Sequence, residues 1–281
     1  TEKDLLLEWT KVIQREDPDI IIGYNIFGFD YEFMFQRARE NGISRKFLQL
    51  SRNKGEVCGK KDRNDELQIE ESTLIIASGQ HDLKFIKMAG RLQVDLYNYF
   101  RREQNLTSYK LDSVAGEFIG DKVKSCEWDE SKQQSLVKSG NLTGLKNKTY
   151  ICFEEIGHST EKVQDGHKFI VDNVDEKAGT FTIEEDVKFT PGKPIRWCMA
   201  KDDVTPQDIF RLTNESATGR STIAKYCIQD CNLVHYLMTK IDVLTGFIEM
   251  AKICSVPIDF IIMRGQGIKL LSFIAKKCRA K

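Results

Sequence analysis

A run of three isoleucines lies between Asp19 and Gly23. A short apolar run without alternation, bounded by chain-breaking residues, is typical of a strand buried on both faces of a sheet. Residues 24–30 predict a turn, and residues 30–41 return to helical spacing of apolar side chains. A strand, a turn and a helix in this order indicate an α/β fold.

Apolar side chains recur at helical spacing along much of the remaining chain. They predict helices over residues 3–15, 95–104, 108–119, 206–212, 219–240, 241–253 and 265–279. Residues 74–76 and 92–94 are candidate strands. The polar stretches 51–72 and 121–140 predict surface loops.

Residues 149–199 change from helical to alternating periodicity. The runs TYICFEE, HKFIVDNV, TFTIEEDV and PIRWCMA each suit a strand. Because helical spacing resumes afterwards, we expect a small β-rich insertion over residues 138–203. We also expect its removal to leave the α/β core folded.

Charge balance and hydropathy exclude several classes of protein. The 281 residues include 42 Lys and Arg against 42 Asp and Glu. A formal net charge of zero excludes a wholly basic nucleic-acid coat and an acidic tail protein, but not a local basic patch. No apolar run approaches the roughly 18 residues that a membrane helix needs, so we expect no membrane partner.

The cysteine pattern indicates free thiols. The eight cysteines are scattered without a CxxC pair, as in proteins of a reducing, intracellular compartment. Cys227, Cys231 and His235 recur every four residues on one expected helix. A metal site there stays open, but a packed helix face is favoured because no fourth ligand is in view.

An acidic residue interrupts the apolar face of the helix expected over residues 219–240. Val234 and Leu237 belong to that face, and Asp230 completes it at helical spacing. A carboxylate there costs stability unless a charged or hydrogen-bonding group meets it. Tyr226 lies four residues earlier, so its hydroxyl can lie beside that carboxylate.

A second acid, Asp30, opens the helix after the isoleucine run, and Asn25 precedes it in the turn. In open α/β folds, ligands gather where strands end and helices begin. Taken singly, Asp30 suits a helix N-cap and Asp230 suits a paired structural acid. Taken together with Asn25 and Tyr226, the two acids suit a divalent-metal site for phosphodiester cleavage, which needs further carboxylates from elsewhere. We therefore expect their carboxyl groups to approach each other across one cleft.

Two motifs resemble those of family B DNA polymerases, of the delta-like and large-DNA-virus type. Asn25-Ile-Phe-Gly-Phe29-Asp30 resembles the second exonuclease motif, and Tyr226-Cys-Ile-Gln-Asp230 resembles the third. The stretch VDLYNYFRREQNLTSYKLDSVAGEFIG is similar to the helical region between those motifs. The stretch GFIEMAKICSVPIDFIIMRGQGIKLLSFIAKK is similar to the segment that leads into the polymerase palm.

The resemblance implies an RNase H-like 3′–5′ exonuclease fold that removes mispaired nucleotides from a primer during DNA replication. Two Mg²⁺ or Mn²⁺ ions would be held by four acids. By position, Asp30 and Asp230 are metal-binding acids, and Tyr226 positions the attacking water. Asn25 helps to hold the frayed strand, and Phe29 is expected to pack rather than to serve as a stacking platform.

The resemblance also implies a division into domains. Residues 1–137 and 204–255 form the two parts of the exonuclease domain, and residues 138–203 form the insertion. Residues 256–281 begin the palm region.

Basic residues supply further DNA-binding candidates. Arg264 and Lys269 belong to a basic C-terminal segment, which is either a solvated face or, as the resemblance implies, a border of the DNA cleft. Lys110 with Tyr109 can touch single-stranded DNA by charge and stacking, with a plain surface pair as the alternative.

The sequence departs from the family pattern at both ends. The first exonuclease motif, a strand bearing D-x-E, and the palm motifs are absent, and there is no initiator Met. We expect a piece of a longer polymerase, weak or inactive as a nuclease by itself. Its expected partners are the primer end, the primer–template, the rest of the polymerase chain and, through other parts, a sliding clamp. The expected location is the nucleus or a viral replication site. The alternatives are an inactive module that binds single-stranded DNA and a stand-alone 3′–5′ exonuclease.

Overall fold

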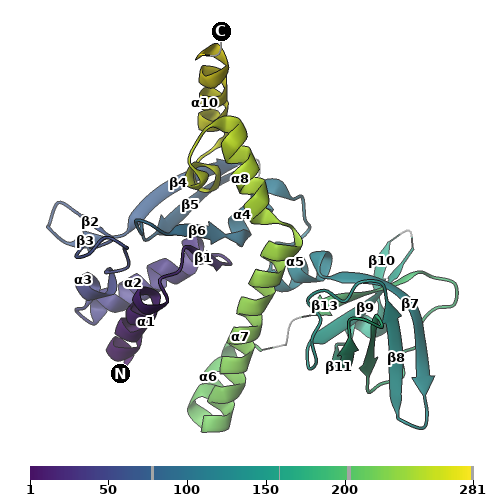
Figure 1. Ribbon diagram of the computed structural model, residues 1–281. Helices are drawn as coiled ribbons and strands as arrows, with labels where there is room; N and C mark the ends of the chain where they lie inside the picture. Colours follow the sequence, from purple (N-terminus) through teal and green to yellow (C-terminus); the bar gives the residue numbers. More distant parts are fainter. Residues whose placement is uncertain (77–78, 158, 201–203, 280–281) are drawn as a thin grey trace. The chain divides into compact units, whose positions relative to one another are not determined.

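The computed structural model describes residues 1–76, 79–157, 159–200 and 204–279 (Figure 1). The chain divides into two compact units. One comprises Thr1–Leu106 with Asp242–Lys281, and we call it the α/β unit. The other comprises Thr107–Ile241, and we call it the barrel unit.

Two parallel strands pair in the α/β unit. β1 (Ile20–Gly23) pairs with β6 (Leu92–Asp95), and Gly23 lies opposite Asp95. Both strands were predicted, and both are confirmed. The side chains of β1 are half-buried along its length, so the prediction of a strand buried on both faces is wrong. Within the described residues β6 is the strand that pairs with β1, and a two-stranded sheet covers its strands less than a wide one.

Helices supply most of the α/β unit's core. They are α1 (Glu2–Glu16), α2 (Tyr31–Glu40), α3 (Ser44–Phe47), α4 (Leu96–Glu103), α8 (Val243–Cys254), α9 (Ile258–Met263) and α10 (Gln266–Arg279). Thr1 begins α1 with a capping box to Asp4. Trp9 of α1 stacks on the buried Phe47 of α3, with ring centroids 5.5 Å apart. The predicted helices are confirmed, and the short α3 and α9 were not predicted.

Two antiparallel strand pairs complete this unit. β2 (Lys60–Lys61) pairs with β3 (Leu67–Gln68), and β4 (Glu70–Ile76) pairs with β5 (Gly79–Phe85). The candidate strand over residues 74–76 is therefore confirmed as part of β4. The loop predicted over residues 51–72 contains β2, β3 and the start of β4.

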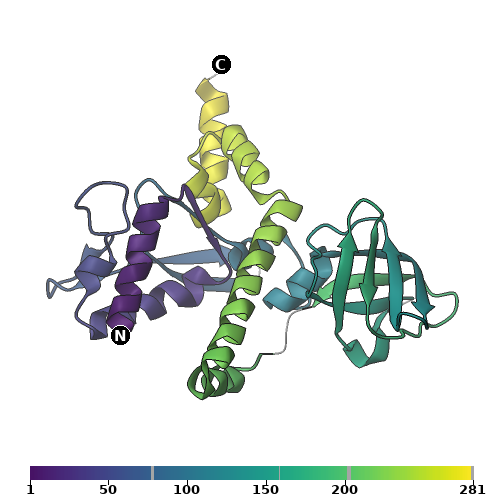
Figure 2. The same ribbon diagram turned by 60° about the horizontal axis from the view of Figure 1, so that its bottom comes forward.

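Six strands of the barrel unit close into a barrel (Figure 2). The order is β9–β11–β12–β8–β7–β13, and β13 pairs back to β9. Its strands are β7 (Gly120–Asp129), β8 (Gln134–Ser139), β9 (Tyr150–Ile156), β11 (Phe169–Asp175), β12 (Thr180–Ile183) and β13 (Ile195–Ala200). The short β10 (Thr160–Lys162) pairs with the end of β9. Large side chains fill the interior, each at most 1% exposed: Phe153, Phe169, Phe181 and Trp197.

The barrel corrects the predicted loop over residues 121–140, which holds β7 and β8. Lys122 and Lys124 are exposed on β7 while Val123 between them is half-buried, so the segment alternates although it is highly charged. The four strands predicted in residues 149–199 are present as β9, β11, β12 and β13. Because the barrel begins at Gly120, deleting residues 138–203 would leave β7 and most of β8 without their other partners. The division into four domains stays a prediction.

Among the described residues of the barrel unit, the α-helices are α5 (Leu111–Phe118), α6 (Pro206–Glu215) and α7 (Ala217–Lys240). The Ser216 hydroxyl caps α7 by accepting a hydrogen bond from the Gly219 amide at 2.9 Å. Gly219 is required here, because a Cβ would lie 2.4 Å from the Leu212 carbonyl oxygen of α6. None of the helices that the structure describes is long and apolar enough to span a membrane.

Candidate functional site

The turn after β1 has an unusual backbone. Asn25 adopts a left-handed conformation, with φ 63° and ψ 26°. Residues Ile26–Asp30 form a π-helical turn, η1, that runs directly into α2. Single π-turns of this kind occur frequently at functional sites.

Gly28 lets this turn close on itself. A Cβ at Gly28 would lie 2.2 Å from the Asn25 Oδ1 atom, which is closer than real side chains approach. The Gly28 and Phe29 amides both donate to the Asn25 carbonyl, at 3.1 and 3.0 Å. The Asn25 side chain therefore lies over Gly28, in space that a larger residue at position 28 would fill.

The turn is anchored by Asp95, a residue that the sequence analysis did not single out. Asp95 is 2% exposed, and its carboxylate accepts hydrogen bonds from the amides of Asn25 (2.7 Å) and Phe27 (3.1 Å). It also caps α4, accepting from the Tyr97 amide and the Asn98 side-chain amide, both at 3.0 Å. One buried carboxylate therefore fixes the turn and starts a helix.

Burial has the largest effect on the pKa of the Asp95 carboxyl group. It raises the pKa of Asp95 to about 6, although the four donors around the carboxylate act in the opposite direction. The sequence does carry a signal for Asp95, because this acid directly follows a candidate strand and precedes a candidate helix. Asp30 stands in a similar position after the isoleucine run, so the same argument applies to both acids.

Asp30 itself is half-buried at the junction of η1 and α2. Its backbone is helical, and its side chain makes no capping hydrogen bond to α2. The helix N-cap alternative is therefore wrong. Burial raises the pKa of Asp30 above its ordinary value. A partly desolvated carboxylate that does not cap its helix is suited to a ligand.

Asp230 and Tyr226 lie four residues apart on α7 of the barrel unit, and both are half-buried. Val234 and Leu237 are buried as predicted. Asp30 belongs to the α/β unit, so the expected approach of Asp30 to Asp230 stays a prediction.

The cysteine and histidine side chains that recur along α7 are more exposed than predicted. Cys227, Cys231 and His235 are all exposed, so the packed helix face predicted for them is wrong. In the part of the chain that the structure describes, no three His, Cys, Asp or Glu side chains are grouped to hold a metal ion.

The DNA-binding candidates differ in exposure. Lys110 is exposed at the start of α5, and Arg264 is exposed with its guanidinium 5.6 Å from the Phe260 ring centre. Phe29 is 58% exposed and its ring stacks on that of Phe33, so its expected packing role stays a prediction. Lys269 is only 5% exposed, and burial, with Arg102 nearby, lowers its pKa. That burial leaves the Lys269 ammonium little surface for a phosphate.

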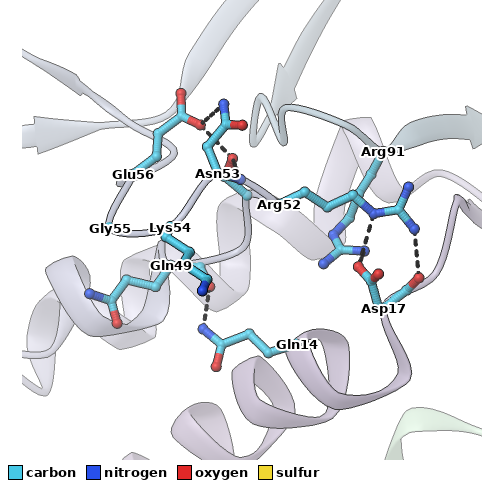
Figure 3. A pocket seen from close by; sticks show the side chains of 10 residues that line it. Gln14, Asp17, Gln49, Arg52, Asn53, Lys54, Gly55, Glu56 and Arg91 are labelled. Carbon is cyan, nitrogen blue, oxygen red and sulfur yellow. Dashed lines mark hydrogen bonds and ion pairs between the residues drawn. The ribbon is translucent and has the colours of Figure 1, made fainter.

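A hollow of about 690 Å³ in the α/β unit is lined by charged side chains (Figure 3). Its two arginines are already engaged. Arg52 and Arg91 bind the same Asp17 oxygen, at 2.9 and 2.8 Å, and Arg91 also donates to the Pro18 and Leu50 carbonyls. This network joins the end of α1 to the segment before β6, so the hollow is structural and we assign it no ligand.

Comparison with known proteins shows which proteins this chain is similar to. Residues 1–114 match the model of the DNA polymerase family B exonuclease domain. The chain is 44% identical over 283 residues to a DNA polymerase of Phaeocystis pouchetii virus, covering 100% of this chain and 27% of that protein. It is 39% identical to a DNA polymerase of Pyramimonas orientalis virus, covering 99% of this chain and 21% of that protein.

A cellular relative matches over the same extent. The catalytic subunit of DNA polymerase delta from Oryza sativa subsp. japonica is 26% identical, covering 100% of this chain and 18% of that protein. The chain thus spans about a quarter or less of the length of these relatives. Through its exonuclease-domain match over residues 1–114 and its full-length similarity to these polymerases, the chain is similar to the family B DNA polymerases.

Proposed function

We propose that this chain provides the 3′–5′ proofreading exonuclease region of a DNA-directed DNA polymerase. The reaction is hydrolysis of the phosphodiester bond at the 3′ end of a primer strand. The proposal includes the RNase H-like arrangement of the exonuclease domain and a role in DNA replication, in the nucleus or at a viral replication site.

The main support for the proposal is the position and burial of the Asp30 carboxylate. Its carboxylate stands at the end of the β1 turn, half-buried, with a raised pKa and no capping bond. Maintaining such a group costs stability unless a ligand compensates. The match of residues 1–114 to an exonuclease domain supports our choice of ligand, a primer 3′ end with divalent ions.

The residues fit Mg²⁺ or Mn²⁺ by their chemistry. Asp30 offers hard carboxylate oxygens that no helix cap uses, which is the donor type that these ions prefer. We propose Asp30 and Asp230 as ligands of two ions, which lower the pKa of the attacking water and neutralise charge on the phosphate when bound. Tyr226, one helical turn before Asp230, orients the water through its hydroxyl.

The DNA contacts come from residues with exposed surface or a fixed orientation. Asn25, held over Gly28, hydrogen-bonds the frayed strand, and Phe29 contacts a base. Lys110 and Arg264 meet phosphates. We leave Lys269 out because its ammonium is buried.

The test uses a polymerase of the relatives' length that carries this region. Nucleotide release from a 3′-mismatched primer is measured with Mg²⁺ or Mn²⁺. Asp30→Ala and Asp230→Ala should each abolish release, and neither should lower the unfolding midpoint. Asp19→Ala is the matched control, because Asp19 lies in the same unit as Asp30 and its side chain is 83% exposed. It should cleave like the wild type.

Cleavage that survives either Asp30→Ala or Asp230→Ala would show that the site lies elsewhere. If the wild type binds single-stranded DNA but releases no nucleotide with either metal ion, the chain is a binding module instead.

A further inference from the structure

Two cysteines face each other across the strand pair β9–β13, which closes the barrel and which we call the barrel seam. Cys152 of β9 lies directly opposite Cys198 of β13 in the antiparallel register. Directly opposite residues place their side chains on the same face of a sheet. Phe153 and Trp197, one position along each strand, fill the barrel interior, so the two thiols lie on its outer face. The sequence does not reveal this pair, because its members are 46 positions apart.

Other parts of the barrel unit cover the outer face at the two thiols. Cys152 is 5% exposed and Cys198 is 4% exposed. The Cys152 thiol donates to the Gly166 carbonyl of the turn η2 (Val163–Gly166) at 3.5 Å, and the Cys198 thiol donates to the Cys152 carbonyl at 3.5 Å. α5 lies against β13, since the Arg196 guanidinium donates to the Gly116 carbonyl at 2.7 Å. The two thiols are therefore held beside each other under a cover of helix and turn.

A hollow of about 330 Å³ reaches both thiols. It is bounded by α5, η2 and the barrel seam, and Cys152 and Cys198 both line it. Charged side chains line it as well: Asp112, Glu117, Glu154, Lys162 and Lys168. Because one water takes up roughly 30 Å³, the hollow has room for a small polar reagent. The thiols are thus accessible to a small molecule although they are buried from bulk solvent.

The strand geometry suits a disulfide that forms under strain. The Ile156 amide donates to the Pro194 carbonyl at 2.8 Å, and hydrogen-bonded pairs alternate with non-hydrogen-bonded pairs along antiparallel strands. Cys152 and Cys198 lie an even number of positions further along, so they are also a hydrogen-bonded pair, with Cα atoms about 5.5 Å apart. Disulfides span Cα separations of about 4.4–6.8 Å. Their Cβ atoms must approach to about 3.5–4.5 Å, which is closer than opposite residues usually lie, so the bond is strained and easily reduced.

We propose that Cys152 and Cys198 are a reversible redox pair, which a small two-electron oxidant converts into a disulfide across the barrel seam. Both S–H bonds break and one S–S bond forms. The thiols lose two protons and two electrons in total, and the oxidant takes up both; the azo compound diamide, for example, becomes a hydrazine. Burial, followed by the charge of Glu154, raises the pKa of Cys198 to about 12, so this thiol reacts slowly and stays reduced until an oxidant is in excess.

The cross-link acts on the closure of the barrel. In the reduced protein the backbone hydrogen bonds between β9 and β13 hold the seam, and they can open and close locally. In the oxidised protein the seam cannot separate at this position until the disulfide is reduced. The inference does not depend on the proposed nuclease activity.

The experiment maps the disulfide in the native protein. The 281-residue chain is treated with diamide, the remaining thiols are blocked with N-ethylmaleimide, and tryptic peptides are analysed without reduction. The expected product joins the peptide that contains Cys152 to the peptide that contains Cys198. Reduced glutathione should restore both thiols. Amide hydrogen exchange in β9 and β13 should slow about tenfold on oxidation, whereas exchange in α2 should stay unchanged.

Cysteine variants make the test specific. Cys152→Ser and Cys198→Ser should each abolish the linked peptide and the response of exchange to diamide. Cys126→Ser is the matched control, because Cys126 is a half-buried thiol on β7 of the same barrel, and it should leave the linked peptide unchanged. The mapping is repeated with the three exposed cysteines changed to Ser, so that cross-links between molecules do not obscure the result: Cys227, Cys231 and Cys278.

Absence of the linked peptide in the native wild type would overturn the proposal. Its appearance only after unfolding in urea would overturn it as well, because the pairing would then reflect a flexible chain and not the barrel seam. A disulfide that forms without slowing exchange in β9 and β13, or that reduced glutathione does not reverse, would show that the pair is no reversible lock of the seam.

Discussion

The two units use β-structure in opposite ways. In the barrel unit, six strands pair in a closed ring, and each strand contributes its inward residues to a core of large aromatic side chains. In the α/β unit, β1 and β6 form a two-stranded sheet, and the ends of these strands hold Gly23 and Asp95. The barrel's strands serve packing along their whole length, whereas β1 and β6 serve mainly to position the turn and the helix at their carboxyl ends.

The two units are stabilised by different kinds of interaction. The barrel encloses a core of buried apolar side chains. The turn that carries Asn25, Phe29 and Asp30 depends on one carboxylate, Asp95, that reaches across from the neighbouring strand. Substitutions should therefore act through cavities in one unit and through lost hydrogen bonds in the other.

The largest effect is expected in the barrel core. Trp197→Ala removes a side chain that is 1% exposed and whose Nε1 donates to the Ser139 hydroxyl at 3.0 Å. Deleting so large a buried ring should lower the unfolding free energy by about 4–5 kcal/mol. Amide hydrogen exchange should rise in β7–β13 and stay unchanged in β1, β6 and α2. Trp128→Ala, at a half-buried position on β7, should cost clearly less. Equal exchange increases in both units would show that the barrel has no separate stability.

The second effect concerns the anchor of the turn. Asp95→Ala leaves the donors of Asn25, Phe27, Tyr97 and Asn98 without their acceptor, and unsatisfied buried donors cost roughly 1–3 kcal/mol each before relaxation. We expect a loss of about 3–4 kcal/mol in denaturant unfolding, with increased exchange of the Asn25 and Phe27 amides. Asp19→Ala breaks an exposed pair with Arg52 and should cost under about 1 kcal/mol. Similar losses for the two variants would contradict an anchoring role.

The third effect is a pH dependence. Because folding raises the pKa of Asp95 from 3.8 to about 6, the folded state binds this proton more tightly than the unfolded state does. The resulting stabilisation is complete below about pH 4 and is lost as the pH rises through about 6. Relative to Asp95→Asn, the wild type should therefore lose about 2–3 kcal/mol over this range.

Neighbouring groups set the control for this measurement. Asp30 contributes with the same sign, since its pKa is also raised, and Tyr31 stays protonated throughout because burial and both carboxylates raise its pKa. Both groups remain in Asp95→Asn and cancel in the difference. A difference between the two proteins that does not change from pH 4 to 7 would assign the pH dependence to other groups.

The smallest effect is expected at Gly28. In Gly28→Ala the new Cβ would occupy the place of the Asn25 Oδ1 atom, so the Asn25 side chain must rotate away. Such local overpacking should cost about 1 kcal/mol and displace Asn25 without unfolding the turn. In the nucleotide-release assay the variant should lose activity far more than stability. Unchanged activity would remove Asn25 from the set of DNA contacts.

The local elements of the candidate site are predictable from the sequence because each depends on neighbours in the chain. The isoleucine run, the glycines of the turn and the helical spacing after Asp30 all act within a few residues. The position of Asp95 between a strand and a helix is visible in the sequence, but its role as an anchor is not, because its partners Asn25 and Phe27 are 70 and 68 residues away. In the sequence, β7 looks like a polar loop because its exposed lysines make the segment highly charged, although apolar and polar residues alternate there as in a strand. The spacing of Phe33 does not tell which face of its helix meets the sheet.

The pairing of β7 with β13 has a consequence for how such a chain is built. The barrel's first and last strands are neighbours, and Gly120 lies directly opposite Cys198. A module whose two ends emerge side by side can be spliced into a host chain at a single loop, since the host needs to open by only one strand spacing. Recombination can add or remove such a module in one event. The natural points for excising the barrel therefore lie just before Gly120 and just after Ala200. In a polymerase that lacks the barrel, we expect a short connection between the helices equivalent to α5 and α6.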